Sequence, residues 1–277
     1  MYSIKSFENG FEYIEIQNEF ASAKIALQGA HIFEYVTKRG SLLWLSEISA
    51  FQSGVAIRGG IPLCWPRFGS LDSSLPQHGF ARTEMFELVE VIEKDAATTE
   101  ILMRFSDSHA TRQIWDYKFV LEVKITLTQE LKIELTTTNK DTKEMMLTQA
   151  LHTYFNITDI SNITIKGLEE KPYLDTLTNE QRSDKNSITV DKEIDRVYQE
   201  VDRDIILIDI KKEIKLHTEG SSSVIVWNPW IEKCSKMSYM NKDAYKEFIC
   251  IESANAFDDF KMLKSQKSHT LSLIASF

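Results

Sequence analysis

A chain of 277 residues with 43% hydrophobic residues can bury one large core or two smaller ones. No stretch approaches 18 uninterrupted apolar residues and the N-terminus lacks an apolar signal segment, so neither a transmembrane helix nor a signal peptide is predicted. The net charge of −9 disfavours binding to nucleic acid or anionic membranes. Three cysteines without CxxC spacing argue against a disulfide framework and fit a reducing cytoplasm.

The first half of the chain is predicted to be rich in β-strands. Apolar and polar residues alternate within residues 11–36, 84–95 and 99–107, which is the pattern of half-buried strands. Residues 108–115 predict a short turn or helix. Segment 117–139 has the clearest alternation, and its polar Gln129-Glu130 pair predicts a tight hairpin.

The second half adds short strands, expected around residues 147–155, 162–167, 204–210, 213–218, 223–228, 247–253 and 269–277. Residues 178–203 are polar and lack a sustained period, so they predict long loops with one short strand. A helix is expected only near 229–240, where Pro229 suits a first turn. Many short strands and few helices predict an all-β fold, a large antiparallel β-sandwich forming a single domain over residues 1–277.

The stretch 54–82 has an unusual composition. It holds five of the ten glycines and three of the five prolines, and both residue types fix turns and close backbone approaches. Arg58, Arg67 and Arg82 against the single acid Asp72 give it a local charge of +2. We interpret it as a rigid loop that binds an anion, with a phosphorylated sugar as our hypothesis. An ordinary connecting loop with solvated arginines is the alternative.

Several common functional motifs are absent from the sequence. The six histidines lie far apart, with no HxH or HExxH, so the sequence predicts no metal site. There is no GxGxxG that opens a helix, no GxxxxGK[ST] and no GxSxG. Nucleotide binding and a serine nucleophile of the hydrolase type are therefore unsupported.

Three residues remain as candidates for acid–base chemistry. Glu252 follows the apolar run FICI, and a buried ionised carboxylate costs several kcal/mol unless it is paired or used. A strand-end residue facing solvent is the alternative. His152 has large apolar neighbours in LTQALHTYFNI, so a core histidine is an alternative there. His78, in PQHGFAR, is either a turn residue bonded to backbone or a site residue.

Six short motifs resemble a known family in the right order along nearly the whole chain. They are IRGGIPLCWPRFG (57–69), HGFAR (78–82), ALHTYF (150–155), EIDRVY (193–198), VIVWNPW (224–230) and FICIESANA (248–256). The chain resembles the hexose-6-phosphate mutarotase branch of the aldose 1-epimerase superfamily. That resemblance implies a galactose mutarotase-like supersandwich with few short helices. It also implies interconversion of the α and β anomers of a hexose 6-phosphate, with glucose 6-phosphate as the first choice, and no metal or cofactor.

The resemblance further implies roles for individual residues. Glu252 would be the general base that takes the C1 hydroxyl proton, and His152 would be the general acid that protonates the ring oxygen. These residue types suit the task, because a carboxylate is a base at pH 7 and histidine titrates near pH ~6.5. The residues expected to bind the substrate are Arg58, Gln77, His78, Arg82 and Asp195.

Each of these binding residues has an expected contact. Arg58, Gln77 and Arg82 would hold the phosphate or sugar hydroxyls, since guanidinium groups make bidentate bonds to phosphate. His78 would be a second donor beside the ring, and Asp195 would accept a bond from a sugar hydroxyl. Trp65 or Phe80 would either present a flat face to the sugar or belong to the core. The sequence assigns no role to Arg67.

Three other functions were weighed. A non-catalytic sugar-phosphate sensor would need the arginines but not both His152 and Glu252. A glycoside hydrolase would need two carboxylates, and only Glu252 has a convincing position. An epimerase of free hexoses would not need the arginines of residues 54–82. We therefore expect an enzyme whose partner is a small sugar phosphate. Length and fold are compatible with a cytoplasmic monomer that binds neither nucleic acid nor membrane.

Overall fold

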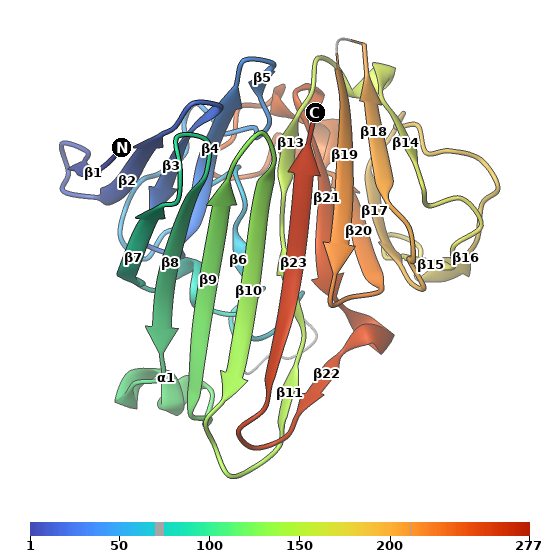
Figure 1. Ribbon diagram of the computed structural model, residues 1–277. Helices are drawn as coiled ribbons and strands as arrows, with labels where there is room; N and C mark the ends of the chain where they lie inside the picture. Colours follow the sequence, from blue (N-terminus) through green and yellow to red (C-terminus); the bar gives the residue numbers. More distant parts are fainter. Residues whose placement is uncertain (70–74, 211) are drawn as a thin grey trace.

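The computed structural model describes residues 1–69, 75–210 and 212–277. Antiparallel strands dominate these residues, in two eight-stranded sheets, one five-stranded sheet and one pair. Figure 1 shows the first eight-stranded sheet in front and the second behind it. The predicted all-β class is therefore confirmed.

The front sheet contains, in spatial order, β14 (Thr164–Lys166), β18 (Ile205–Asp209), β19 (Lys212–Glu219), β23 (Ser268–Ser276), β10 (Leu131–Asn139), β9 (Phe119–Leu127), β8 (Thr99–Ser106) and β7 (Glu87–Glu93). Strands β9 and β10 alternate strictly between buried and half-buried side chains. They pair with Leu127 opposite Leu131, so the predicted hairpin is confirmed. The buried side chains of this sheet form one face of the core.

The second sheet contains β16 (Glu180–Arg182), β15 (Tyr173–Asp175), β17 (Ile194–Tyr198), β20 (Ser223–Asn228), β21 (Phe248–Asn255), β12 (Gln149–Leu151) and β6 (Leu63–Cys64), with β13 (Tyr154–Asn156) also paired to β21. All eight residues of β21 are buried. A strand buried on both faces lies between two packed layers. One face of β21 meets the front sheet, where Ser253 bonds to Thr218 of β19 at 2.7 Å.

The N-terminal sheet contains β1 (Tyr2–Ser6), β2 (Glu12–Gln17), β3 (Ala21–Ala26), β4 (His31–Thr37) and β5 (Gly40–Ser41), and the separate pair is β11 (Met145–Leu147) with β22 (Lys261–Leu263). Buried side chains from this sheet and both large sheets belong to one hydrophobic cluster. The extent of the single domain, residues 1–277, stays a prediction.

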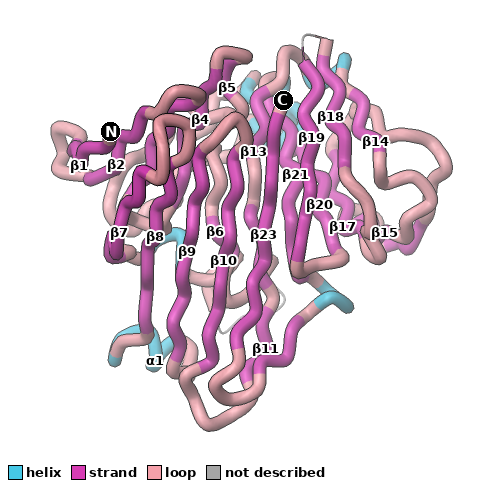
Figure 2. Tube along the Cα trace, viewed as in Figure 1, coloured by secondary structure: helices cyan, strands magenta, loops and turns pink. Residues whose placement is uncertain are grey.

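Helices are few and short, as Figure 2 shows in cyan. They are α1 (His109–Ile114), α2 (Trp230–Cys234) and the 3-10 turns η1 (Ala81–Thr83), η2 (Ile160–Asn162), η3 (Ala244–Lys246) and η4 (Phe257–Asp259). Both expected helical segments are confirmed, although Pro229 caps α2 rather than starting its first turn. In the described part of the chain no helix has the length and hydrophobicity to cross a membrane.

The sequence prediction missed several short strands, among them β5, β6, β15 and β22, which lie outside the segments predicted to be strands. Residues 178–203 hold two strands, β16 and β17, instead of one. Strand β17 lies inside the second sheet between β15 and β20, but its buried positions do not alternate, so it has no two-residue period. Strand β1 was not expected, although Tyr2 and Ile4 alternate with polar residues in it; all five of its residues are exposed.

Candidate active site

The register of the second sheet brings His152 and Glu252 together. Leu151 pairs with Ser253, and Tyr154 pairs with Cys250. Extending the first pairing by one step, or the second by two, places His152 opposite Glu252. Their Nδ1 and Oε1 atoms are 3.2 Å apart. Both residues are buried, at 8% and 1% exposure, so this imidazole–carboxyl pair lies almost entirely out of water.

One pocket of about 630 Å³ is lined by all seven predicted site residues, namely Arg58, Gln77, His78, Arg82, His152, Asp195 and Glu252. Cross-strand pairing builds its floor. Asp195 of β17 pairs with Trp227 of β20, and Ile225 of β20 pairs with Glu252 of β21. Paired residues share a face of the sheet, as do residues two apart, so these four side chains point to one side.

The stretch 54–82 forms another wall of the pocket, with residues 70–74, including Asp72, outside the described residues. Two glycines allow its close approach to the sheets. A Cβ on Gly60 would lie 2.4 Å from the Ile32 carbonyl oxygen, and one on Gly79 would lie 2.0 Å from that of Trp65. Both glycines have positive φ, where a side chain is strained. The expected rigidity of this stretch therefore comes from contacts that exclude any side chain.

His78 is oriented by its own loop. The Gly69 N–H donates to His78 Nδ1 at 3.3 Å, and the His78 N–H donates to the Gly69 carbonyl at 2.8 Å. With Nδ1 acting as acceptor, the proton of the neutral ring is on Nε2. The ring centroid lies 5.7 Å from that of His152. His78 is thus a hydrogen-bond donor at the pocket wall.

The two arginines that line the pocket lack carboxylate partners within residues 1–69, 75–210 and 212–277. Arg82 Nη2 donates to the Gln77 carbonyl at 2.7 Å, and no described carboxylate forms a salt bridge with either arginine. Arg58 Nε is buried without a hydrogen-bond partner. A buried cationic group with unused donors is costly unless an anion binds there. The pocket therefore presents a site for an anionic group.

Burial shifts the titration of the acid–base groups in opposite directions. Burial, followed by the charges of Arg82 and Arg58, lowers the pKa of His78 to about 3. Burial also lowers the pKa of His152, with smaller contributions from His78 and the same arginines. Burial and then the charge of Asp195 raise the pKa of Glu252. In the empty pocket, a proton shared by His152 and Glu252 is therefore favoured on the carboxyl.

The match to known proteins covers the whole length of this fold. The model of the family "Aldose 1-epimerase" matches residues 12–276. An Escherichia coli (strain K12) protein named "Putative glucose-6-phosphate 1-epimerase" is 31% identical over 264 residues, which span 93% of this chain and 88% of that protein. The chain belongs to the aldose 1-epimerase family.

Solved structures agree with this family assignment. The crystal structure of a "putative mutarotase" from Salmonella typhimurium has a TM-score of 0.92 at 29% identity, covering 99% of this chain and 92% of that one. A galactose mutarotase related enzyme from Lactobacillus acidophilus has a TM-score of 0.74 at 16% identity, covering 95% and 96%. The latter shows likeness of fold alone. The expected galactose mutarotase-like sandwich is confirmed.

The sequence left two roles open for Trp65 and Phe80 of this aldose 1-epimerase family member, a face at the pocket or a place in the core, and the structure shows the second. Trp65 and Phe80 do not line the pocket; both are buried in the core, where Trp65 Nε1 donates to Thr137 Oγ1 at 2.8 Å. Tyr154 and Trp227 line the pocket instead. The Tyr154 ring stacks on His152 at 4.9 Å and 8°, so it holds the imidazole plane. Trp227 meets His152 edge-on, at 5.8 Å and 88°.

The alternation of side chains in the strand that ends at Asn228 could have indicated the position of Trp227. In VIVWNPW, Trp227 is two residues from Ile225, and the two therefore share a face. Lys233, in the last turn of α2, and Lys236, just after the helix, also line the pocket, and nothing in the sequence pattern predicts this position for them. Arg67 does not line the pocket, and its Nη1 donates to the Met146 carbonyl at 2.5 Å.

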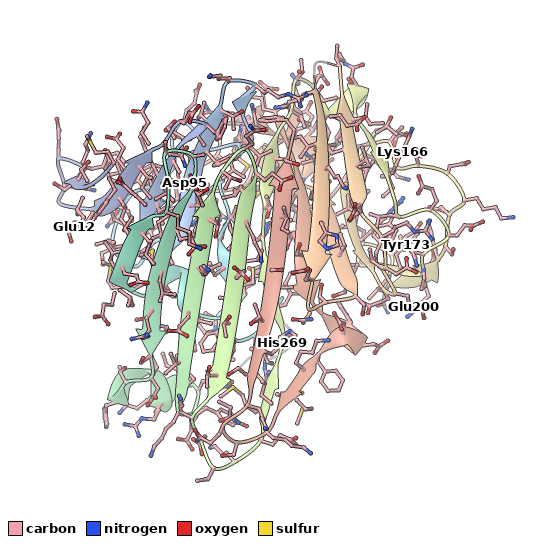
Figure 3. All side chains as sticks on the ribbon, viewed as in Figure 1. Glu12, Asp95, Lys166, Tyr173, Glu200 and His269 are labelled. Atoms are coloured by element: carbon pink, nitrogen blue, oxygen red, sulfur yellow. The ribbon has the colours of Figure 1, made fainter. Side chains whose placement is uncertain are left out.

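The remaining histidines of the family member lie elsewhere. His269, labelled in Figure 3, is on β23 of the front sheet, where its Nε2 contacts Asn255 Oδ1 at 3.0 Å. His217 Nδ1 contacts Asp204 at 2.6 Å, and buried His31 contacts the Gly59 carbonyl at 2.8 Å. Of the six histidines, all within the described ranges, only His78 and His152 line the pocket.

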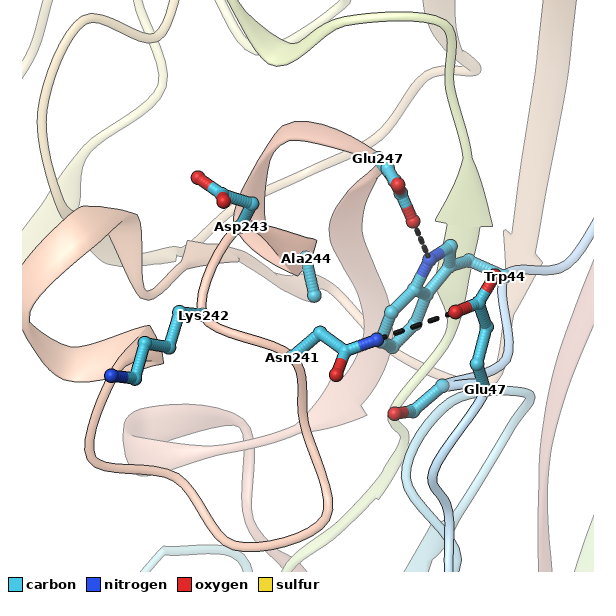
Figure 4. Close-up of a pocket in the computed structure, with 8 residues that line it drawn as sticks. Trp44, Glu47, Asn241, Lys242, Asp243, Ala244 and Glu247 are labelled. Carbon is cyan, nitrogen blue, oxygen red and sulfur yellow. Dashed lines mark hydrogen bonds between the residues drawn. The ribbon is translucent and has the colours of Figure 1, made fainter.

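A second pocket of about 390 Å³, shown in Figure 4, is lined by Trp44, Ser46, Glu47, Asn241, Lys242, Asp243, Ala244 and Glu247. Its central polar groups bond to one another. Trp44 Nε1 donates to Glu247 at 3.1 Å, and Asn241 donates to Glu47 at 3.3 Å. None of the seven predicted site residues lines it. All seven predicted site residues therefore belong to the larger pocket.

The shifted histidines give a direct test by NMR. We expect the rings of His78 and His152 to be neutral at about pH 5.5 in the empty protein, where an ordinary histidine is mostly protonated. Long-range ¹H–¹⁵N spectra report the protonation of ring nitrogens, and His78→Ala and His152→Ala assign the two signals. Protonation of either ring near the ordinary value of 6.5 would refute the described electrostatics.

The buried carboxyl should also reduce stability. The folded pKa of Glu252 is raised above its ordinary value of 4.5. Above pH 4.5 the unfolded chain therefore loses a proton that the folded protein keeps, and the stability of the fold falls as the pH rises. Glu252→Gln is expected to raise the free energy of unfolding at pH 7 by roughly 1–3 kcal/mol. The gain should shrink as the pH approaches 4.5. Denaturant unfolding at pH 7 and at about pH 5 measures both values. An unchanged or lower stability at pH 7 would contradict this expectation.

Proposed function

We propose that this protein interconverts the α and β anomers of a hexose 6-phosphate, with glucose 6-phosphate as the expected substrate. One observation supports it most. The same pocket contains a buried imidazole–carboxyl pair and two arginines without a described carboxylate partner. The pair suits opening of a sugar ring, and the arginines suit a phosphate. The E. coli relative carries the name of such an enzyme.

The proposed reaction needs one proton removed and one delivered. Glu252 takes the proton of the C1 hydroxyl while His152 protonates the ring oxygen, so the C1–O bond breaks and an aldehyde forms. Rotation about C1–C2 exposes the other face of the aldehyde. Closure then returns the Glu252 proton to the carbonyl oxygen, and His152 recovers its proton from the ring hydroxyl. The pair holds one proton before and after opening, so each cycle restores the enzyme.

The phosphate itself should prepare the general acid. In the empty pocket the positive charges of Arg58 and Arg82 contribute to the lowered pKa of His152. A phosphate bound to these arginines offsets their charge, so it raises the proton affinity of His152 and favours the state with the shared proton on His152 rather than on Glu252. Ring opening reverses this arrangement and leaves the proton on Glu252. The burial of the pair therefore stabilises the protonation state that accompanies the open-chain sugar.

Binding roles follow from the same geometry. Arg58, Arg82 and Gln77 would hold the phosphate or hydroxyls, and His78 would donate to the sugar from Nε2. Asp195 would accept from a sugar hydroxyl, with its main-chain carbonyl already bonded to Thr176 at 2.9 Å. Three buried free cysteines support a reducing cytoplasmic location. We also propose a single domain acting as a monomer.

A glycoside hydrolase is the second candidate, because the pocket holds a second carboxyl. Asp195, expected as a substrate-binding residue, lines it together with Glu252. His152 opposite Glu252 favours anomer exchange instead, because the usual glycosidase pair consists of two carboxyl groups. Aryl glucosides distinguish the two, since a hydrolase releases the aryl alcohol.

Polarimetry on freshly dissolved α-glucose 6-phosphate tests the proposed function. The protein should speed the approach to anomeric equilibrium above the spontaneous rate, and it should leave aryl glucosides intact. Absence of any acceleration with glucose, mannose and galactose 6-phosphates would refute the enzymatic proposal and leave the non-catalytic sensor.

A further inference from the structure

A buried thiol lies next to the acid–base pair. Cys250 is two residues before Glu252 on β21, so both side chains point to the same face of the sheet. It pairs with Tyr154 on one side and with Trp227 on the other, and both of these line the pocket. Cys250 is fully buried and forms no disulfide. The thiol therefore lies beneath the floor of the pocket.

Three different donor atoms converge at this point. One ring nitrogen of His152, Cys250 Sγ and a Glu252 carboxylate oxygen all lie within 4.8 Å of one another. Two polar atoms of the group are unsatisfied, since His152 Nδ1 and Glu252 Oε2 are buried without a described hydrogen-bond partner. The 3.2 Å contact is thus close without being aligned as a hydrogen bond. Unsatisfied buried atoms of this kind need an explanation.

The donor set matches one class of ion. Imidazole, thiolate and carboxylate together suit zinc, whereas magnesium and calcium take oxygen ligands. A tetrahedral zinc at ordinary bond lengths separates its ligand atoms by roughly 3.3–3.6 Å, so binding would draw the most widely separated of the three atoms together by about 1 Å. Arg58 and Arg82 oppose a cation, and binding must displace the protons of Cys250 and Glu252; once both are displaced, the two ligands supply two negative charges, with Asp195 also lining the pocket.

We propose that His152, Cys250 and Glu252 form a binding site for a zinc ion at the floor of this pocket. The ion enters through the pocket, and the thiol proton leaves to solvent as the thiolate coordinates. Binding does not depend on the proposed function. The effect of bound zinc on activity does rest on the proposed function. Zinc would occupy both the general acid and the general base, so it would inhibit the enzyme in competition with the sugar phosphate.

Cobalt(II) gives a direct measurement of the site, because a cobalt–thiolate bond produces a charge-transfer absorption that oxygen and nitrogen ligands do not. The wild-type protein should bind one cobalt(II) per chain with this band, and zinc should displace it. Cys250→Ala should lose the band and bind zinc more than about 100-fold more weakly, since even loss of a ligand's outer partner costs roughly 10–100-fold.

Cys234→Ala is the matched control. Cys234 is also fully buried, but it lies on α2 and its thiol donates to the Asn241 carbonyl at 3.3 Å. This variant should keep the cobalt band. A wild-type protein without the band, or a band that survives in Cys250→Ala, would overturn the proposal. The first criterion needs no variant to fold and no substrate to turn over. It therefore fails or succeeds separately from the anomer-exchange assay.

Discussion

Glu252→Gln is expected to lower the rate of anomer exchange by roughly 10²–10⁴-fold, because acid–base help of this kind has that magnitude. The amide keeps the size of the side chain but cannot accept the C1 hydroxyl proton. His152→Ala should cause a similar loss, since the ring oxygen then lacks its donor. The two changes together should cost little more than either alone, because the residues act as one pair. Saturation-transfer NMR on glucose 6-phosphate measures the rate.

Glu247→Gln is the control for this experiment. It makes the same chemical change just before β21, but Glu247 lines the second pocket and accepts from Trp44. A glutamine oxygen can accept the same bond, so turnover should be unchanged. Normal turnover in Glu252→Gln or His152→Ala would remove that residue from the mechanism. Unfolding curves of the variants show whether a loss reflects chemistry alone.

Arg82→Ala is expected to lower kcat/KM for glucose 6-phosphate by roughly 10–100-fold, the equivalent of one charged hydrogen bond of about 1.5–3 kcal/mol. Turnover of free glucose should change far less, because glucose has no phosphate for the guanidinium to bind. Arg58→Ala should behave in the same way. Part of the loss should be in kcat, since the bound phosphate also raises the proton affinity of His152.

Arg67→Ala separates a local effect from a general loss of charge. Arg67 belongs to the same basic stretch but does not line the pocket, and it donates to a backbone carbonyl. Its removal should leave the KM for glucose 6-phosphate unchanged. If Arg82→Ala weakened glucose and glucose 6-phosphate equally, Arg82 would not be a phosphate ligand.

Much of the site could be predicted because its residues belong to short motifs. No side chain fits at Gly60 or Gly79, so glycine is required at both positions. Each glycine is part of a short motif that also contains a site residue, Arg58 in the first and His78 in the second. The strict alternation of β9 and β10 likewise identified the central hairpin. In both cases a constraint on neighbouring residues, either the space around a glycine or the burial of one strand face, is visible in a short stretch of sequence.

Other features depend on pairing between distant segments, which the sequence does not display. Asp195 reaches the pocket through β17, a strand without a two-residue period. Trp65 and Phe80 have the chemistry of sugar-stacking residues, but they are packed in the core. Cys250 becomes a neighbour of His152 only through the register of β21 with β13. That register also explains why widely spaced histidines and cysteines gave no sign of a metal site.

Selectivity between glucose 6-phosphate and glucose in a single solution tests the central claim most directly. Exchange NMR follows the anomeric signals of both sugars in one tube, with the same enzyme and the same buffer. The acid–base pair, beside two arginines that have no carboxylate partner among the described residues, predicts faster exchange for the phosphate ester at protein concentrations that leave glucose at its spontaneous rate. Equal acceleration of both sugars would contradict the phosphate site, and acceleration of neither would contradict the acid–base pair.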